Sequence, residues 1–138
     1  MDEHNAEVLR DQYDAVNQRD WKRAMSHYAA DVELVIPEGT WMNDGIHKGR
    51  DAVGRWFGDW FETFDRSVHF DITELTELED GSIILIADHR LRGRASGIEL
   101  EEPIAWRYRM QEGKIVRVEG IQPERARKIV RREGEPRG

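Results

Sequence analysis

The sequence predicts an α+β domain in which a strongly curved, antiparallel or mixed sheet wraps around N-terminal helices to form a cone. Three observations predict this class. Apolar residues recur every three or four positions in three segments before residue 65, with a short β-branched run between the second and the third. Beyond that point the apolar period changes to two. Asp80-Gly81 and Glu112-Gly113 mark hairpin turns between the later strands.

Two helices and a strand are expected at the start of the chain. The first helix covers 5–18, and Asp20 is a favourable N-cap for the second, over 21–29. The apolar face of the first helix carries Val8, Leu9, Gln12, Tyr13 and Val16. The second is expected to bury Trp21, Ala24, Met25 and Tyr28. A β-branched run over 32–36, ended by Pro37, predicts the strand.

A loop and a long helix are expected next. Glycines and an Asn-Asp-Gly turn signal between residues 38 and 49 predict a loop that contains Trp41. From 50 to 64 the apolar residues step by three and four, which is the strongest helical pattern in the chain. The apolar face of this helix is almost wholly aromatic and includes Trp56 and Trp60.

Four strands and a final helix complete the predicted domain. The strands, joined largely as antiparallel hairpins, are expected over 68–72, 82–94, 98–110 and 114–120. The final helix is expected over 123–130. We therefore expect a single domain over 1–138, with its core over about 8–129 and a polar tail over 131–138.

The composition excludes several classes of protein. The chain has 138 residues, with 21 Lys and Arg against 28 Asp and Glu and a net charge of −7, which argues against nucleic-acid and membrane partners. It contains no cysteine, which excludes thiolate metal sites and cysteine nucleophiles and is typical of a reducing compartment. The first residues lack the basic and apolar segments of a signal peptide. We therefore expect a cytoplasmic protein.

Five tryptophans in so polar a chain indicate either a core filled with rings or a cavity with aromatic walls. Helix packing accounts for Trp21, Trp56 and Trp60. Trp41 and Trp106 have less obvious partners and predict the walls of a pocket. The residues expected to line this pocket are Ile36, Trp41, Trp60, Glu102, Trp106 and Tyr108.

Five segments carry a resemblance to a known family. They are YDAVNQRD at 13–20, YAADVE at 28–33, GRDAV at 49–53, RGRASGIE at 92–99 and GKIVR at 113–117. In this order and spacing they resemble the SnoaL-like branch of the nuclear transport factor 2-like superfamily, from about Val8 to about Ile129. The resemblance implies a cystatin-like cone with an open mouth. It implies no particular reaction, because this superfamily uses one cone for isomerases, polyketide cyclases, hydrolases and binding proteins.

Two catalytic patterns of this superfamily are only partly met. For the ketosteroid isomerase pattern, Tyr13 falls at the tyrosine hydrogen-bond donor, but Ile36 stands at the carboxylate base and Trp106 at the second donor. For the epoxide hydrolase pattern, Asp88-His89-Arg90 lies in the right strand, but Gly120 stands where the partner acid belongs. The resemblance therefore implies that ketosteroid isomerisation itself is not the reaction.

His89 is the expected general base and Tyr13 the expected hydrogen-bond donor. Strand alternation places His89 on the apolar, inward face of its strand, where an imidazole can take up a proton near neutral pH. The alternative is a core histidine bonded to a backbone carbonyl or to Tyr13. Glu102 is expected at the rim of the cone, either beside tryptophan with a raised pKa or solvated.

No metal and no cofactor are expected, because His27, His47 and Asp44 have no short ligand spacing. Arginines and acids alternate on the outer face of two adjoining strands, which predicts a two-fold interface between two copies of the chain. The arginines are Arg90, Arg92, Arg94, Arg107 and Arg109, and the acids are Asp88, Glu99 and Glu101. We therefore expect a homodimer through the outer sheet face.

The preferred hypothesis is an aromatic-walled pocket for a small hydrophobic molecule. Cofactor-free acid–base chemistry, such as isomerisation, cyclisation or hydrolysis, would take place in this pocket, with His89 and Tyr13 as the reacting groups. The rival hypothesis is a non-catalytic ligand-binding or dimeric interaction domain. The apolar Ile36 at the position of the base favours this rival.

Overall fold

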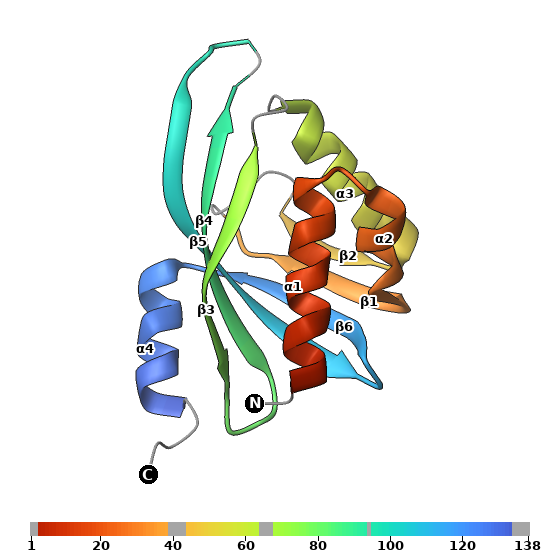
Figure 1. Ribbon diagram of the computed structural model, residues 1–138, viewed down its shortest axis with the longest axis vertical. Coiled ribbons are helices and arrows are strands. Elements are labelled where there is room, and N and C mark those ends of the chain that lie inside the picture. Colours follow the sequence, from red (N-terminus) through yellow and green to blue (C-terminus); the bar gives the residue numbers. More distant parts are fainter. Residues whose placement is uncertain (1–2, 39–43, 64–67, 94, 134–138) are drawn as a thin grey trace.

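A six-stranded, strongly curved and unclosed sheet forms the body of the molecule in the computed structural model, which describes residues 3–38, 44–63, 68–93 and 95–133 (Figure 1). The order of the strands is β2-β1-β6-β5-β4-β3. Their bounds are β1 Tyr28–Ile36, β2 Gly45–Lys48, β3 His69–Glu77, β4 Ile83–Arg92, β5 Glu99–Gln111 and β6 Lys114–Ile121. β1 and β6 run parallel, and the other neighbours run antiparallel. The expected α+β class with a curved sheet is confirmed.

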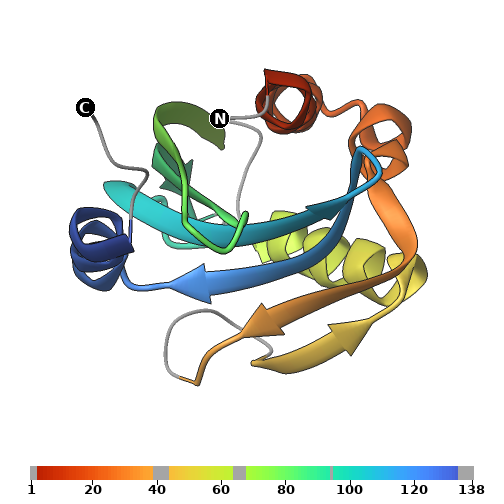
Figure 2. The same ribbon diagram turned by 90° about the horizontal axis from the view of Figure 1, so that it is seen from below.

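The helices cover the two faces of the sheet unequally. α1 (Glu3–Asn17) and α3 (Arg50–Thr63) lie on the concave face, and α2 (Trp21–Ser26) packs on α1. α4 (Pro123–Glu133) lies on the opposite face, over β4 and β5 (Figure 2). None of these described helices has the length and apolarity needed to cross a membrane.

The side chains of β4 alternate between two cores. Leu85 belongs to the main core beneath α1 and α3. Ile84 and Ile86 point to the other face and pack with Ala126 of α4. This alternation follows the period of two in the sequence, and it buries His89 on the concave side with 2% of its surface exposed.

The turns fall where the sequence predicts them. In the β5–β6 hairpin, Glu112 and Gly113 have φ values of 50° and 76°. Two successive positive φ values are typical of a type I′ turn, for which glycine is well suited. In the β3–β4 connection Gly81 also has a positive φ, of 85°.

The second helix is shorter than the sequence predicts. It ends at Ser26, and Tyr28 is the first residue of β1 rather than part of the helix. The carbonyl of His27 accepts a hydrogen bond from the backbone N–H of Ile115, so pairing with β6 draws this segment into the sheet. Trp21 is 38% exposed, with one edge against Phe61, and is therefore not buried as expected.

A strand that the sequence does not predict lies within the expected loop. Residues 45–48 form β2 and pair antiparallel with residues 33–36 of β1. β2 has only four residues, and three of them are exposed. Such a short edge strand carries almost no apolar periodicity, which is why only its turn residues are recognisable in the sequence.

Candidate functional site

A cavity opens between α1, α3 and the concave face of the sheet. Its aromatic wall consists of Trp56, Phe57, Trp60, Phe70 and Trp106. Its aliphatic wall consists of Val16, Leu34 and Val118. Its polar side chains are Gln12, Tyr13, Tyr28 and Tyr108, which we call the polar cluster. Since no charged residue is found among the described lining residues, the cavity suits a neutral molecule.

The cavity is a narrow slot. The free space among the lining atoms, including solvent at the mouth, is about 500 Å³, of which about 40 Å³ is wide enough for the centre of a water molecule. One water requires about 10–15 Å³ of such space. An aromatic ring is at least as thick as a water molecule, so a flat organic ligand fits the cavity only where wall rings move aside.

The aromatic wall is held by contacts between its own rings. The rings of Trp56 and Trp106 meet edge to face, with centroids 6.4 Å apart and an interplanar angle of 86°. Trp60 and Phe70 lie 5.9 Å apart at 30°. Such pairs are favourable beyond the area they bury, so they hold the shape of the wall.

The hydroxyl groups of Tyr13 and Tyr108 are 2.8 Å apart and form a buried hydrogen bond. Tyr13 comes from the middle of α1 and Tyr108 from β5. Burial raises the pKa of Tyr13 and that of Tyr108 above the ordinary value for a phenol, so both hydroxyls stay protonated at neutral pH. Their mutual bond uses one of the two hydrogens, and the other can be donated to a third acceptor.

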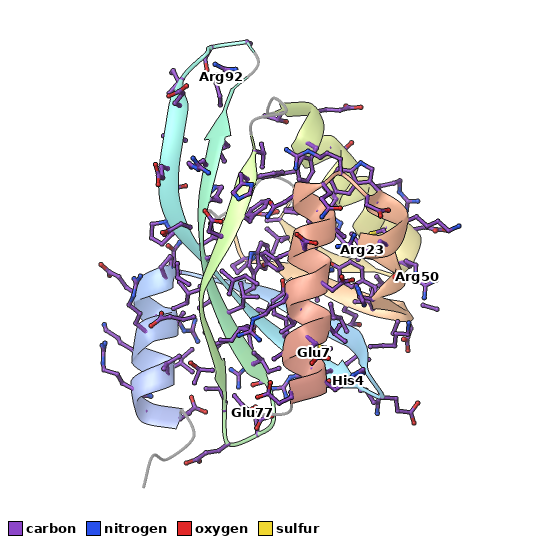
Figure 3. The ribbon with its side chains drawn as sticks, in the orientation of Figure 1. His4, Glu7, Arg23, Arg50, Glu77 and Arg92 are labelled. Atoms are coloured by element: carbon purple, nitrogen blue, oxygen red, sulfur yellow. The ribbon has the colours of Figure 1, made fainter. Side chains whose placement is uncertain are left out.

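Gln12 and Tyr28 complete the polar cluster. The side chain of Gln12 is 2% exposed, and its amide hydrogen bonds to the hydroxyl of Tyr28. Burial also raises the pKa of Tyr28. Arg50, at the start of α3, donates to the Tyr28 carbonyl oxygen at 2.8 Å and so fixes the beginning of β1 (Figure 3).

Sequence reasoning did not identify Gln12 or Tyr28 as site residues. A signal was available for Gln12, because it is the one amide on an otherwise apolar or aromatic helix face. Tyr28 is buried as expected, but it begins β1 instead of lying in the expected helix. Phe57 and Phe70 were also missed as wall residues.

His89 lies next to the cavity but is not one of its lining residues. Its ring stacks on Phe70, with centroids 5.8 Å apart and an interplanar angle of 12°, and lies 6.4 Å from Trp60. Nδ1 is 3.0 Å from the carbonyl oxygen of Glu102, and a carbonyl only accepts, so Nδ1 carries a hydrogen. Burial lowers the pKa of His89, which favours a neutral ring with its basic lone pair on Nε2.

Glu102 does not enter the cavity. Its side chain is exposed, and it borders a wider groove beside α4 instead. The reason is the shape of the β4–β5 hairpin, which extends past the helices that cover the concave face (Figure 1). Leu100 on the same stretch is 48% exposed. The inward-facing positions at this end of β5 are therefore solvated, although His89, opposite Glu102 on β4, is buried.

The other expected pocket residues divide into three groups. Trp60, Trp106 and Tyr108 lie in the cavity wall together with Tyr13. Ile36 is buried in the main core but does not line the cavity. Trp41 lies outside the described residues.

The described part of the chain contains no cluster of side chains that could bind a metal ion. No three His, Asp or Glu side chains there gather closely enough to hold a metal ion. His27 and Asp11 form a pair, with Nε2 and Oδ2 2.7 Å apart, on the surface between α1 and the end of α2. Two such groups are fewer ligands than a protein metal site normally supplies.

Known structures resemble this chain in fold. Bal32a, from a soil-derived mobile gene cassette, is 23% identical and superimposes with a TM-score of 0.76 over 86% of this chain and 88% of its own. TerC, co-crystallised with polyporic acid, is 20% identical, with a TM-score of 0.75 over 93% and 98%. RV0760c from Mycobacterium tuberculosis, in complex with estradiol-17beta-hemisuccinate, is 18% identical, with a TM-score of 0.71 over 86% and 93%.

Sequence comparison assigns the family. No curated protein sequence matches the chain significantly. The family model of the SnoaL-like domain matches residues 9–118, which include the later part of α1, all of α2 and α3, and most of the sheet. The fold neighbours agree with this match. The chain therefore belongs to the SnoaL-like domain family, within the nuclear transport factor 2-like fold.

Proposed function

We propose that the cavity binds a small, flat, neutral molecule that is largely apolar and carries a carbonyl or similar oxygen. The observation that carries this proposal is the buried Tyr13–Tyr108 hydroxyl pair inside an aromatic wall. The pair has one hydrogen to donate, and a ligand oxygen can accept it. Two of the fold neighbours hold small molecules in their crystals, which supports a binding role for a cavity in this fold.

The test uses two probes of similar shape, acetophenone and ethylbenzene. Titrations are followed by the NMR signals of the tryptophan indole N–H groups. We expect acetophenone to bind about three- to tenfold more tightly, because its oxygen gains one hydrogen bond. Changing Tyr13 and Tyr108 together to Phe removes both hydroxyls and keeps both rings, so the double variant should lose this preference and leave ethylbenzene binding nearly unchanged. Equal affinities of the wild-type protein for the two probes would overturn the proposal.

A second candidate function is acid–base catalysis in the same cavity, and the position of His89 favours it. His89 Nε2 would take a proton from the carbon next to the ligand carbonyl, and the C–H electron pair would form an enolate. The tyrosine pair would donate a hydrogen bond to the enolate oxygen, and the proton would return to the same carbon or, where a C=C bond is conjugated with the enolate, to the far carbon of that bond. Because Phe70 stacks on His89 and itself lines the wall, this ring must move for contact. Binding is therefore the better supported function.

Proton exchange tests catalysis without a known substrate. Wild-type protein in D2O should accelerate deuterium uptake at the methyl group of acetophenone. His89→Ala should remove the acceleration while acetophenone still binds. Exchange no faster than in buffer would exclude this chemistry for acetophenone, and acceleration that persists in His89→Ala would remove the proposed base.

We also propose a cytoplasmic location, on the ground that the sequence contains no cysteine.

We further propose a homodimer through the outer sheet face. Arg107 and Arg109 are less available for such an interface than the sequence indicates, because Asp80 of the same chain pairs with both, at 2.8 and 3.1 Å. Arg90 and Glu101 remain exposed and lie opposite each other on β4 and β5. Arg92 lies at the far end of the same hairpin (Figure 3). Sedimentation showing only a monomer at micromolar concentration would overturn the dimer.

A further inference from the structure

The side-chain oxygen of Gln12 has no hydrogen-bond partner within the described residues, although the atom is fully buried. Most buried polar atoms in folded proteins have a partner, and an isolated one calls for an explanation. The Gln12 side chain also interacts with the hydroxyl of Tyr28, and this interaction lowers the Tyr28 pKa against the effect of burial. The unpaired Oε1 belongs to a residue of the cavity wall. A buried acceptor without a partner therefore belongs to the cavity wall, and a ligand reaches it only where the wall opens.

The hydroxyls of the tyrosine pair do not bond to this acceptor in the structure. Tyr13 and Tyr108 bond to each other at 2.8 Å. Burial raises the pKa of each phenol, so these groups remain hydrogen-bond donors at neutral pH. The polar cluster thus offers a ligand at least one donor, from the tyrosine pair, and one acceptor, from Gln12.

We propose that Gln12 selects ligands that carry a neutral hydrogen-bond donor, a hydroxyl or N–H group, in addition to the oxygen that the tyrosine pair recognises. The ligand class is then a hydroxylated or amino-substituted aromatic carbonyl compound. This inference rests on the proposed binding function of the same cavity. It excludes phenolates, because an ionised ligand oxygen has no hydrogen for Gln12, and the described wall contains no cation to offset its charge.

The test compares five probes that share the acetophenone frame. They are acetophenone itself, hydroxyacetophenone in its meta and para forms, and the methyl analogues of both, in which a methyl group replaces the hydroxyl. We expect one hydroxyl form to bind the wild-type protein at least about threefold more tightly than its methyl analogue. Raising the pH until the phenol ionises should abolish this preference and leave acetophenone binding unchanged.

Three variants test whether Gln12 causes the preference for a hydroxyl group. Gln12→Leu should remove or reverse the hydroxyl preference, while the preference for acetophenone over ethylbenzene remains. Gln111→Leu is the matched control, since Gln111 is exposed at the end of β5, and it should behave as wild type. Tyr28→Phe breaks the bond to the Gln12 amide but leaves Oε1 in place, so the hydroxyl preference should persist. Loss of the preference in Tyr28→Phe would show that Gln12 acts only by supporting Tyr28.

Two outcomes separate this inference from the proposed function. If acetophenone binds no more tightly than ethylbenzene, the binding role of the tyrosine pair fails. If acetophenone binds more tightly than ethylbenzene but neither hydroxyl form binds more tightly than its methyl analogue, only the role of Gln12 fails. Oε1 is then satisfied by water. The comparison in the wild-type protein needs no variant, so a Gln12→Leu protein that does not fold leaves the inference testable.

Discussion

The side chain of Asn17 forms the two backbone hydrogen bonds with Phe70 that a neighbouring strand would otherwise form. Its side-chain nitrogen donates to the Phe70 carbonyl oxygen at 2.8 Å, and its side-chain oxygen accepts from the Phe70 backbone nitrogen at 2.9 Å. Because β3 is an edge strand, the amide covers backbone groups that would otherwise be open to another chain. The same two bonds hold Phe70 in the cavity wall and against His89.

Asn17→Ala should lower the free energy of unfolding by about 1–3 kcal/mol, because two backbone groups lose their partner. Denaturant unfolding measures this change. Gln18→Ala is the matched control, since the side-chain bonds of Gln18, to Asp14 and from Arg23, are both exposed, and its effect should stay within about 0.5 kcal/mol. A loss no larger than that of the control would contradict the structural role of Asn17.

A double-mutant cycle on Tyr13 and Tyr108 should show strong coupling. Each single change to Phe leaves the other hydroxyl buried without its partner, which should cost about 1–3 kcal/mol. Changing both residues removes both hydroxyls, so the double variant should lose clearly less stability than the sum of the single ones. Thermal and denaturant unfolding of the four proteins provide the measurement. Additive losses would mean that the two hydroxyls do not interact in solution.

The elements with strong periodicity could be predicted from the sequence. The helix expected over 50–64 is found at Arg50–Thr63, because its apolar residues step regularly by three and four. The inward position of His89 followed from strict alternation along β4. The turn at Glu112-Gly113 followed from local chemistry alone, since few residues tolerate two positive φ values in succession.

The polar cluster could not be predicted, because its contacts depend on tertiary geometry. Tyr13 and Tyr108 are 95 residues apart, and periodicity gives the face that each occupies but not which residue lies opposite. Tyr28 was misassigned because the local pattern from Trp21 onward is compatible with a helix, and pairing with β6 overrides it. Glu102 was placed near the cone because alternation gives the direction of a side chain but not where the covering helices end.

Asp80 should make stability depend on pH in the acid range. Hydrogen bonds from Ser82 hold the pKa of Asp80 well below its usual value, and the charges of Arg107 and Arg109 lower it further. In the unfolded chain this carboxyl takes up a proton near pH 4, whereas in the folded protein it does so only at lower pH. Its contribution to stability is therefore complete above about pH 4 and is lost as the pH falls below that value.

Asp80→Asn tests this dependence. We expect a loss of about 1 kcal/mol at pH 7, a modest figure because the Asp80 side chain is 40% exposed and solvent screens its ion pairs. Below about pH 4 the wild-type protein and the variant should converge in stability. Glu99→Gln, which alters the long Arg92–Glu99 pair of 3.8 Å, is the control and should change little at either pH. A difference that stays constant across the acid range would contradict a titrating Asp80.

His89 should make the protein less stable in mildly acidic solution. Burial lowers its pKa, while the backbone bond to Glu102 and the charges of Glu102 and Asp88 offset part of this effect. The unfolded chain takes up a proton at this position near pH 6.5, and the folded protein resists protonation until lower pH. The contribution of neutral His89 to stability is thus complete above about pH 6.5 and falls as the pH drops through the range below it.

His89→Phe should reduce this dependence of stability on pH between about pH 6.5 and 5, whereas His69→Gln, which replaces a side chain that is 40% exposed, should retain it. Parallel curves for wild type and His89→Phe, measured by denaturant unfolding at each pH, would show that His89 stays equally protonated in the folded and unfolded states.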